Sequence, residues 1–225
     1  MKTGAFIFGL FVTAGIILNA CKKDDTALPV DKTNDGTFKV FTEGNITTVQ
    51  NLSADTIIGI AQNGQPYGSG SFTFFSLENK TLIPRSDSAT TKWDIGFRGT
   101  TIITNGGTSG PGAGGAFVWK GAFTDLTVIS DDSIFKTDNG GSYGIPIGSN
   151  NGWYNYNGAV NIVTPLPGRV LIIRTAKGKY AKVEILNYYK KGVTPAASET
   201  DDVKLKSQRY YTFRYVFQPS GSKSF

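Results

Sequence analysis

The stretch Val170-Leu171-Ile172-Ile173-Arg174-Thr175-Ala176-Lys177-Gly178-Lys179-Tyr180-Ala181-Lys182-Val183-Glu184-Ile185 decides the fold class. Val170–Thr175 and Tyr180–Leu186 are short, rich in β-branched residues, and too short for typical helices. The second run alternates, which predicts that Ala181, Val183 and Ile185 face inward while Lys182 and Glu184 face outward. Gly178 favours a positive φ between them, so the two runs are expected to form a hairpin.

The same pattern recurs along most of the chain. Tyr210–Phe217 places four aromatic residues on one face, and no sustained 3.6-residue periodicity is found. An all-β, antiparallel domain with long loops is therefore predicted, with short helical turns near Ser86–Thr91 and Asp125–Ser133. The polar segment Tyr188–Gln208 is read as an exposed loop. The other expected strands are Phe38–Phe41, Ile46–Gln50, Thr56–Ala61, Ser71–Leu77, Trp93–Arg98, Thr100–Thr104, Ala116–Lys120 and Val160–Val163.

The N-terminus has the features of an export signal. Lys2 precedes an apolar run, Ala5–Leu18, that is too short for a comfortable membrane span, and Leu18-Asn19-Ala20-Cys21 resembles a bacterial lipobox. The alternative is an ordinary signal peptide with an incidental Cys. We expect a signal peptide over residues 1–20, a lipidated tether over 21–35 and one β domain over 36–225. Lys22-Lys23-Asp24-Asp25 resembles the surface-export signal of Bacteroidetes lipoproteins, which indicates the outer membrane and its cell-surface side.

Composition excludes many kinds of site. The 225 residues include 39% hydrophobic and 18% charged residues, which is typical of a folded domain, but no His, one Cys and one Met. A Ser-His-Asp triad, a His-ligated metal and an intrachain disulfide are all excluded. The formal net charge of +6 is spread along the chain rather than concentrated in a basic block, so no nucleic-acid partner is expected.

The glycine-rich stretch Asn105–Gly115 contains a G-x-G-x-x-G match at Gly110, Gly112 and Gly115. That motif binds a pyrophosphate only where it leads into a helix, and here a strand-like run follows. The stretch is read as a turn or as one wall of a ligand cleft. The cleft residues proposed from it are Gly106, Gly107, Gly110 and Gly112.

Two other groups of residues are candidates for chemistry. Carboxylates could in principle form a glycosidase pair or bind calcium, but no spacing singles out two of them. No catalytic residue and no metal ion are therefore expected, and the protein is read as a binding protein rather than an enzyme. The aromatic side chains of Tyr143, Trp153, Tyr154 and Tyr156 lie in a Gly/Asn-rich setting, where they would either stack on a planar ligand or sugar or cover the core. The carboxylates are Asp94, Asp125, Asp131, Asp132, Asp138 and Glu184.

Several blocks, in this order and spacing, resemble the HmuY family of Bacteroidetes lipoproteins. They are Ser71–Leu77, Lys92–Arg98, Thr104–Gly110, Gly114–Ala116, Arg174–Val183 and Tyr211–Tyr215. The resemblance implies an all-β fold, a surface lipid anchor and the capture of haem for an outer-membrane receptor. It also implies two axial His or Met ligands to the iron.

Those ligands carry over onto no residue, because the chain has no His and its only Met is Met1. The ligand-bearing region corresponds to about Asp138–Asn161. Haem or another porphyrin could then be held through a Tyr phenolate at Tyr143, Tyr154 or Tyr156, or by stacking and propionate contacts alone. The alternative is a carbohydrate- or protein-binding lipoprotein on the same scaffold that does not bind haem.

Overall fold

The computed structural model describes residues 1, 34–56, 59–62 and 66–225. The expected signal peptide, Cys21 and all but the last residues of the expected tether lie outside the described residues. Within the described ranges, no helix is both long enough and apolar enough to cross a membrane.

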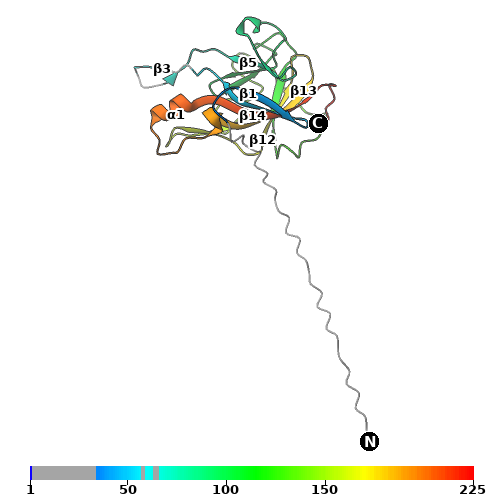
Figure 1. The fold of residues 1–225 in the computed structure, drawn as a ribbon. Helices are drawn as coiled ribbons and strands as arrows, with labels where there is room; N and C mark the ends of the chain where they lie inside the picture. Colours follow the sequence, from blue (N-terminus) through cyan, green and yellow to red (C-terminus); the bar gives the residue numbers. More distant parts are fainter. Residues whose placement is uncertain (2–33, 57–58, 63–65) are drawn as a thin grey trace. The chain divides into compact units, whose positions relative to one another are not determined.

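The main element is a six-stranded antiparallel sheet (Figure 1). The long strands β13 and β14 lie at its centre and pair with each other over most of their length. The fold class predicted from the sequence, an all-β antiparallel domain, is confirmed. The strands in spatial order are β1 (Lys39–Glu43), β2 (Ile46–Ser53), β14 (Gln208–Gln218), β13 (Tyr180–Tyr189), β12 (Arg169–Arg174) and β9 (Gly115–Lys120).

The predicted hairpin is confirmed. Leu171 pairs with Val183 and Ile173 with Ala181, and all four side chains are buried. The turn between β12 and β13 contains Gly178 at φ +77°, a conformation that costs glycine no steric strain.

A second sheet of four antiparallel strands covers one face of the first. The rings of Phe75 and Phe97 in this sheet pack against Phe213 of β14, with centroid separations of 5.8 and 5.4 Å. The apolar inner faces of the two sheets therefore form the main core. The strands in spatial order are β6 (Thr81–Ile83), β5 (Thr73–Ser76), β7 (Ile95–Arg98) and β8 (Thr101–Thr104).

Smaller elements complete the described fold. Of the two predicted helical turns, η1 (Arg85–Asp87) lies near Ser86–Thr91, whereas Asp125–Ser133 contains no helix. The interpretation of Tyr188–Gln208 as a loop was wrong, because it contains a helix. The remaining elements are the hairpins β3 (Gly59–Ile60)–β4 (Pro66–Tyr67) and β10 (Tyr154–Asn157)–β11 (Ile162–Pro165), η2 (Lys190–Gly192) and α1 (Asp201–Ser207).

The outer face of the six-stranded sheet is not open to solvent at Lys182. Alternation predicted that this side chain faces outward from the core, yet only 6% of Lys182 is exposed. Phe123, Leu126 and Ile129 cover this face, and the Lys182 Nζ donates hydrogen bonds to the carbonyl oxygens of Phe123 (3.0 Å) and Leu126 (2.6 Å). A period of two identifies the two faces of a strand but does not show whether a loop covers the second one.

Candidate functional site

A pocket of about 940 Å³ opens at one end of the sandwich. Its walls come from the β7–β8 turn, the β10–β11 hairpin, helix α1 and the start of β14, with Ile60 of β3 at the edge. Helix α1 and β3 lie on the same side of the domain in Figure 1, away from the label of the C-terminus. The volume is within the range of small-molecule sites in proteins.

The inner wall of the pocket is aromatic. Tyr154 and Tyr188 line it, and Trp153 packs behind both rings with centroid separations of 4.9 and 5.6 Å. Trp153 is only 1% exposed, and its indole Nε1 donates a hydrogen bond to the carbonyl of Thr100. Trp153 therefore lies in the core and supports the pocket tyrosines from behind. Burial raises the pKa of the Tyr188 phenol, although the neighbouring Arg209 charge acts in the opposite direction.

The rim carries one exposed aromatic ring. Tyr156 of β10 is 46% exposed and lines the pocket, while its hydroxyl donates a 2.6 Å hydrogen bond to Oδ1 of Asn161. Ser149 Oγ accepts a hydrogen bond from the Tyr156 backbone N–H. Tyr156 is thus held at the pocket by its hydroxyl and its backbone, and its half-exposed ring suits stacking on a ligand.

Charged groups cluster in the same pocket. It is lined by three basic side chains, Arg98, Lys204 and Arg209, and by two carboxylates, Asp55 and Asp201. Burial opposes the ionisation of Asp55, but hydrogen bonds from Ser69 and Gly70 and the Arg209 charge outweigh it and lower the pKa of that carboxyl. The pocket therefore combines flat apolar surface with charges of both signs.

The glycine-rich loop does not contribute to this pocket. It folds around the buried Asn105, whose Oδ1 accepts a hydrogen bond from the Gly112 N–H, and Gly110 packs against the same amide. A Cβ on Gly106 would lie 2.1 Å from the carbonyl oxygen of Gly114, and Gly107 has φ +61°. The glycines there permit close backbone approach.

Tyr143, another predicted ligand contact, lies elsewhere. It is half-buried against the cluster of Phe74, Trp93 and Ile103 on the outer face of the four-stranded sheet. Of the four aromatic candidates, the structure therefore brings Tyr154 and Tyr156 into the pocket, places Trp153 behind it and leaves Tyr143 outside.

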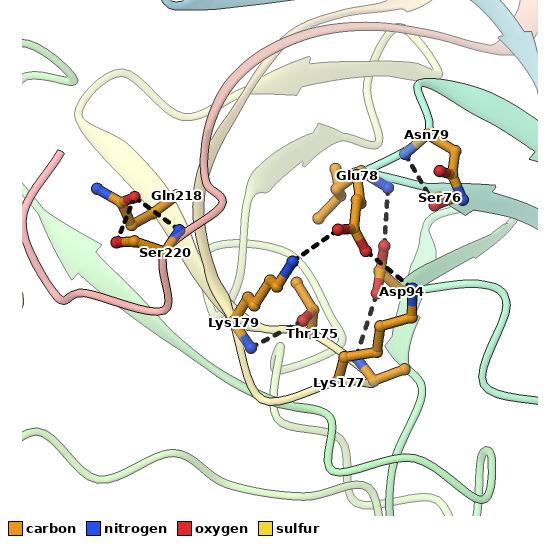
Figure 2. Close-up of polar contacts among 11 residues, drawn as sticks. Ser76, Glu78, Asn79, Asp94, Thr175, Lys177, Lys179, Gln218 and Ser220 are labelled. Carbon is orange, nitrogen blue, oxygen red and sulfur yellow. Dashed lines mark hydrogen bonds and ion pairs between the residues drawn. The ribbon is translucent and has the colours of Figure 1, made fainter.

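The candidate carboxylates are dispersed, and several have evident structural roles. Asp94 is buried and accepts backbone hydrogen bonds from Leu77 (2.8 Å) and Ala176 (3.2 Å), while Glu78 bridges Lys177 and Lys179 beside it (Figure 2). Asp138 accepts from the backbone of Thr104 and Gly144. Across the described residues, no three His, Cys, Asp or Glu side chains gather closely enough to hold a metal ion.

Sequence reasoning missed the residues of the pocket that lie outside Asp138–Asn161. Arg98, Tyr188, Lys204 and Arg209 are separated widely in sequence and meet only in the fold. A signal for α1 was present: Thr200 is followed by Asp201 and Asp202, which is typical of a helix start. Thr200 Oγ1 accepts a hydrogen bond from the Val203 N–H in the structure.

Comparison with known proteins identifies the family. The model of the HmuY protein family matches residues 69–200, which is more than half of the chain. The chain belongs to the HmuY family. The matched range includes the pocket residues Arg98, Tyr154, Tyr156 and Tyr188, whereas Lys204 and Arg209 follow it.

Solved structures similar to this HmuY-family chain share little sequence identity with it. A protein of Bacteroides fragilis assigned as a lipoprotein has 15% identity and a TM-score of 0.46, covering 80% of this chain and 95% of its own. A Bacteroides vulgatus protein assigned as HmuY-like and haem-binding has 14% identity and a TM-score of 0.46, covering 76% and 91%. The apo HmuY analogue of Tannerella forsythia has 16% identity and a TM-score of 0.42, covering 80% and 97%. No curated protein matches the chain in sequence.

Proposed function

We propose that this protein is a non-enzymatic binding protein that takes a flat, partly apolar ligand into the pocket at the end of the sandwich, and that the ligand is haem or another porphyrin. The observation that carries the proposal is the tyrosine-walled, basic pocket of about 940 Å³ in an HmuY-family chain. Membership of the HmuY family supports the choice of ligand.

The residues of the pocket offer aromatic rings and basic side chains to a porphyrin, but they limit how its iron is held. The sequence has no His, and its only Met is Met1, so the imidazole and thioether ligands of the family have no counterpart. Of the tyrosines considered as iron ligands, Tyr154 and Tyr156 line the pocket, and their phenol oxygens are the candidate ligands to ferric iron. The ring of Tyr156 stacks on the ligand in this proposal, and Tyr154 contacts it from the wall.

The same proposal includes the location of the protein. Cys21 carries a lipid that anchors the mature chain to the outer membrane, and the β domain faces the outside of the cell. There it passes its ligand to an outer-membrane receptor, which serves iron acquisition. Nucleic acid is not a partner.

A second candidate is a carbohydrate- or protein-partner-binding lipoprotein. It is favoured by the rim of the pocket, where the exposed ring of Tyr156 lies beside the hydroxyl of Ser149 and the amide of Asn161. An aromatic face next to polar groups suits a sugar ring as well as a porphyrin. A glycan panel applied to the same protein separates this candidate from the first.

The test is a titration with haemin, followed by Soret absorbance and tryptophan fluorescence. We expect saturable binding with one haem per chain. Tyr156→Ala removes the stacking ring and should weaken binding by about three- to tenfold. Phe38→Ala, which removes another exposed ring outside the pocket, is the matched control and should leave the affinity unchanged. If haemin produces no saturable change in either oxidation state of the iron, the porphyrin proposal is wrong.

A further inference from the structure

Two arginine side chains that line the pocket have more N–H donors than the hydrogen bonds found for them use. Arg98 Nη1 donates a 3.3 Å hydrogen bond to the Gly70 carbonyl, and Arg209 Nη1 donates a 2.8 Å bond to the Asp55 carbonyl. A guanidinium has five N–H donors. Among the described residues, neither Arg98 nor Arg209 forms an ion pair with a carboxylate.

The two pocket carboxylates are already engaged by other groups. Asp55 accepts backbone hydrogen bonds from Ser69 (2.7 Å) and Gly70 (3.0 Å). Asp201 accepts a 3.1 Å hydrogen bond from the Asn161 amide and lies 3.8 Å from the Lys204 Nζ. Lys204 is therefore partly compensated by Asp201, whereas Arg98 has no carboxylate of its own.

Both arginine side chains are held in place. The Arg98 guanidinium lies 4.3 Å from the centroid of the Phe72 ring, a cation–π contact that fixes its plane. The Arg209 side chain is held by its hydrogen bond to the Asp55 carbonyl, and its backbone has a φ of +69°, a left-handed conformation that is uncommon for a residue other than glycine. Such strain persists where the surrounding structure requires it, and it clusters at ligand sites.

We infer that Arg98 and Arg209 form an anion-binding subsite, and that the ligand of this pocket carries carboxylate groups. This inference rests on the proposed function, because it specifies the chemistry of the ligand in the same pocket. Planar guanidinium groups bind carboxylates with paired, charge-assisted hydrogen bonds. A neutral glycan would leave the Arg98 guanidinium without a countercharge.

The experiment compares haemin with its dimethyl ester, which keeps the macrocycle and the iron but lacks both free carboxylates. We expect haemin to bind the protein at least tenfold more tightly than the ester. Arg98→Gln should weaken haemin binding by about tenfold or more and leave ester binding unchanged. Arg98→Lys retains the charge without the planar fork and should recover part of the loss. Arg209→Gln should act in the same direction as Arg98→Gln.

Arg169→Gln serves as the control, because Arg169 lies on β12 outside the pocket. A melting temperature measured for each variant shows whether it folds. Equal affinity of the folded wild-type protein for haemin and ester overturns the subsite while the binding function stands. If Arg98→Gln weakens the affinity for haemin and for the ester equally, the subsite is also overturned, because the role of Arg98 would then be structural. Failure of both ligands to bind the wild-type protein overturns the subsite and the porphyrin proposal together.

Discussion

At the scale of single residues, the buried polar groups of this protein connect backbone segments that are distant in sequence. The carboxylate of Asp94, on the segment entering β7, accepts the N–H of Leu77 after β5 and that of Ala176 in the β12–β13 turn. One side chain thus joins the four-stranded sheet to the six-stranded one. Burial raises its pKa, and the backbone hydrogen bonds only partly offset that effect.

Replacing Asp94 with Asn should destabilise the fold. The amide keeps the size of the side chain, but its NH2 group would face one of the two N–H donors, so one hydrogen bond is lost. We expect a loss of about 1–3 kcal/mol in the free energy of unfolding, measured by urea denaturation. Asp125→Asn changes an exposed carboxylate and should have no measurable effect. Equal stabilities of the two variants would contradict the role assigned to Asp94.

Glu78 gives the same region a dependence on pH. Hydrogen bonds from Lys179 and Lys177 lower the pKa of its carboxyl below the ordinary value of 4.5. The stabilising contribution is therefore present above pH 4.5 and is lost as pH falls through the lowered pKa. Asp94 has the opposite sign, because its raised pKa makes its contribution decline as pH rises above 3.8.

Glu78→Gln should lower stability by about 0.5–1 kcal/mol at pH 7, since the ion pairs are partly exposed. The difference from wild type should shrink as the pH is lowered toward 3, and high salt should reduce it at pH 7. Unfolding curves across this pH range provide the measurement. Glu199→Gln changes an exposed glutamate outside these ion pairs and is the matched control. A difference that stays constant with pH would contradict the assignment.

At the scale of elements, helix α1 links the stability of the fold to the pocket. Its seven residues bring Asp201, Lys204 and Leu205 to the pocket wall. So short a helix depends on its cap and on tertiary contacts rather than on its own propensity. The Thr200 side chain caps it, and the Lys204 Nζ anchors it to the Ala197 carbonyl at 2.9 Å.

Thr200→Ala should therefore loosen the helix and weaken ligand binding. Loss of an N-cap costs about 1 kcal/mol locally, which corresponds to about a fivefold loss of affinity if binding requires the formed helix. The melting temperature of the whole domain should change little, because α1 contributes little to the main core. Thr164→Ala, an exposed position on β11, is the control. A large fall in melting temperature with unchanged affinity for haemin would contradict this coupling.

The sequence predicted the central strands and their turn better than it predicted which residues a covering loop buries. The central strands follow from local alternation, and the hairpin around Gly178 follows from turn chemistry. Strand β10 was missed because Tyr154–Asn157 alternates aromatic rings with Asn and reads as a loop. Helix α1 was missed because its polar composition was weighed above its N-terminal cap. Burial of Lys182 depends on a covering loop, which no local pattern reveals.

At the scale of the whole molecule, local sequence patterns predicted only part of the pocket. The sequence indicated the β10 region, where Tyr154 and Tyr156 line the pocket, but it grouped Trp153 and Tyr143 with them. Arg98 and Arg209 meet there because β7 and β14 belong to sheets that pack face to face. Contacts between residues more than 100 positions apart cannot be read from spacing when only one sequence is considered.

The order of strands also has a consequence for biosynthesis. Strand β14, made last among the described strands, lies between β2, made near the start, and β13. While β14 is still within the ribosome, β2 and β13 have no central partner, and the six-stranded sheet cannot close. Such non-local pairing slows folding. A nascent chain of this design completes its main sheet only after β14 has been made, which favours passage through an export channel before folding is finished, as the lipoprotein proposed here requires.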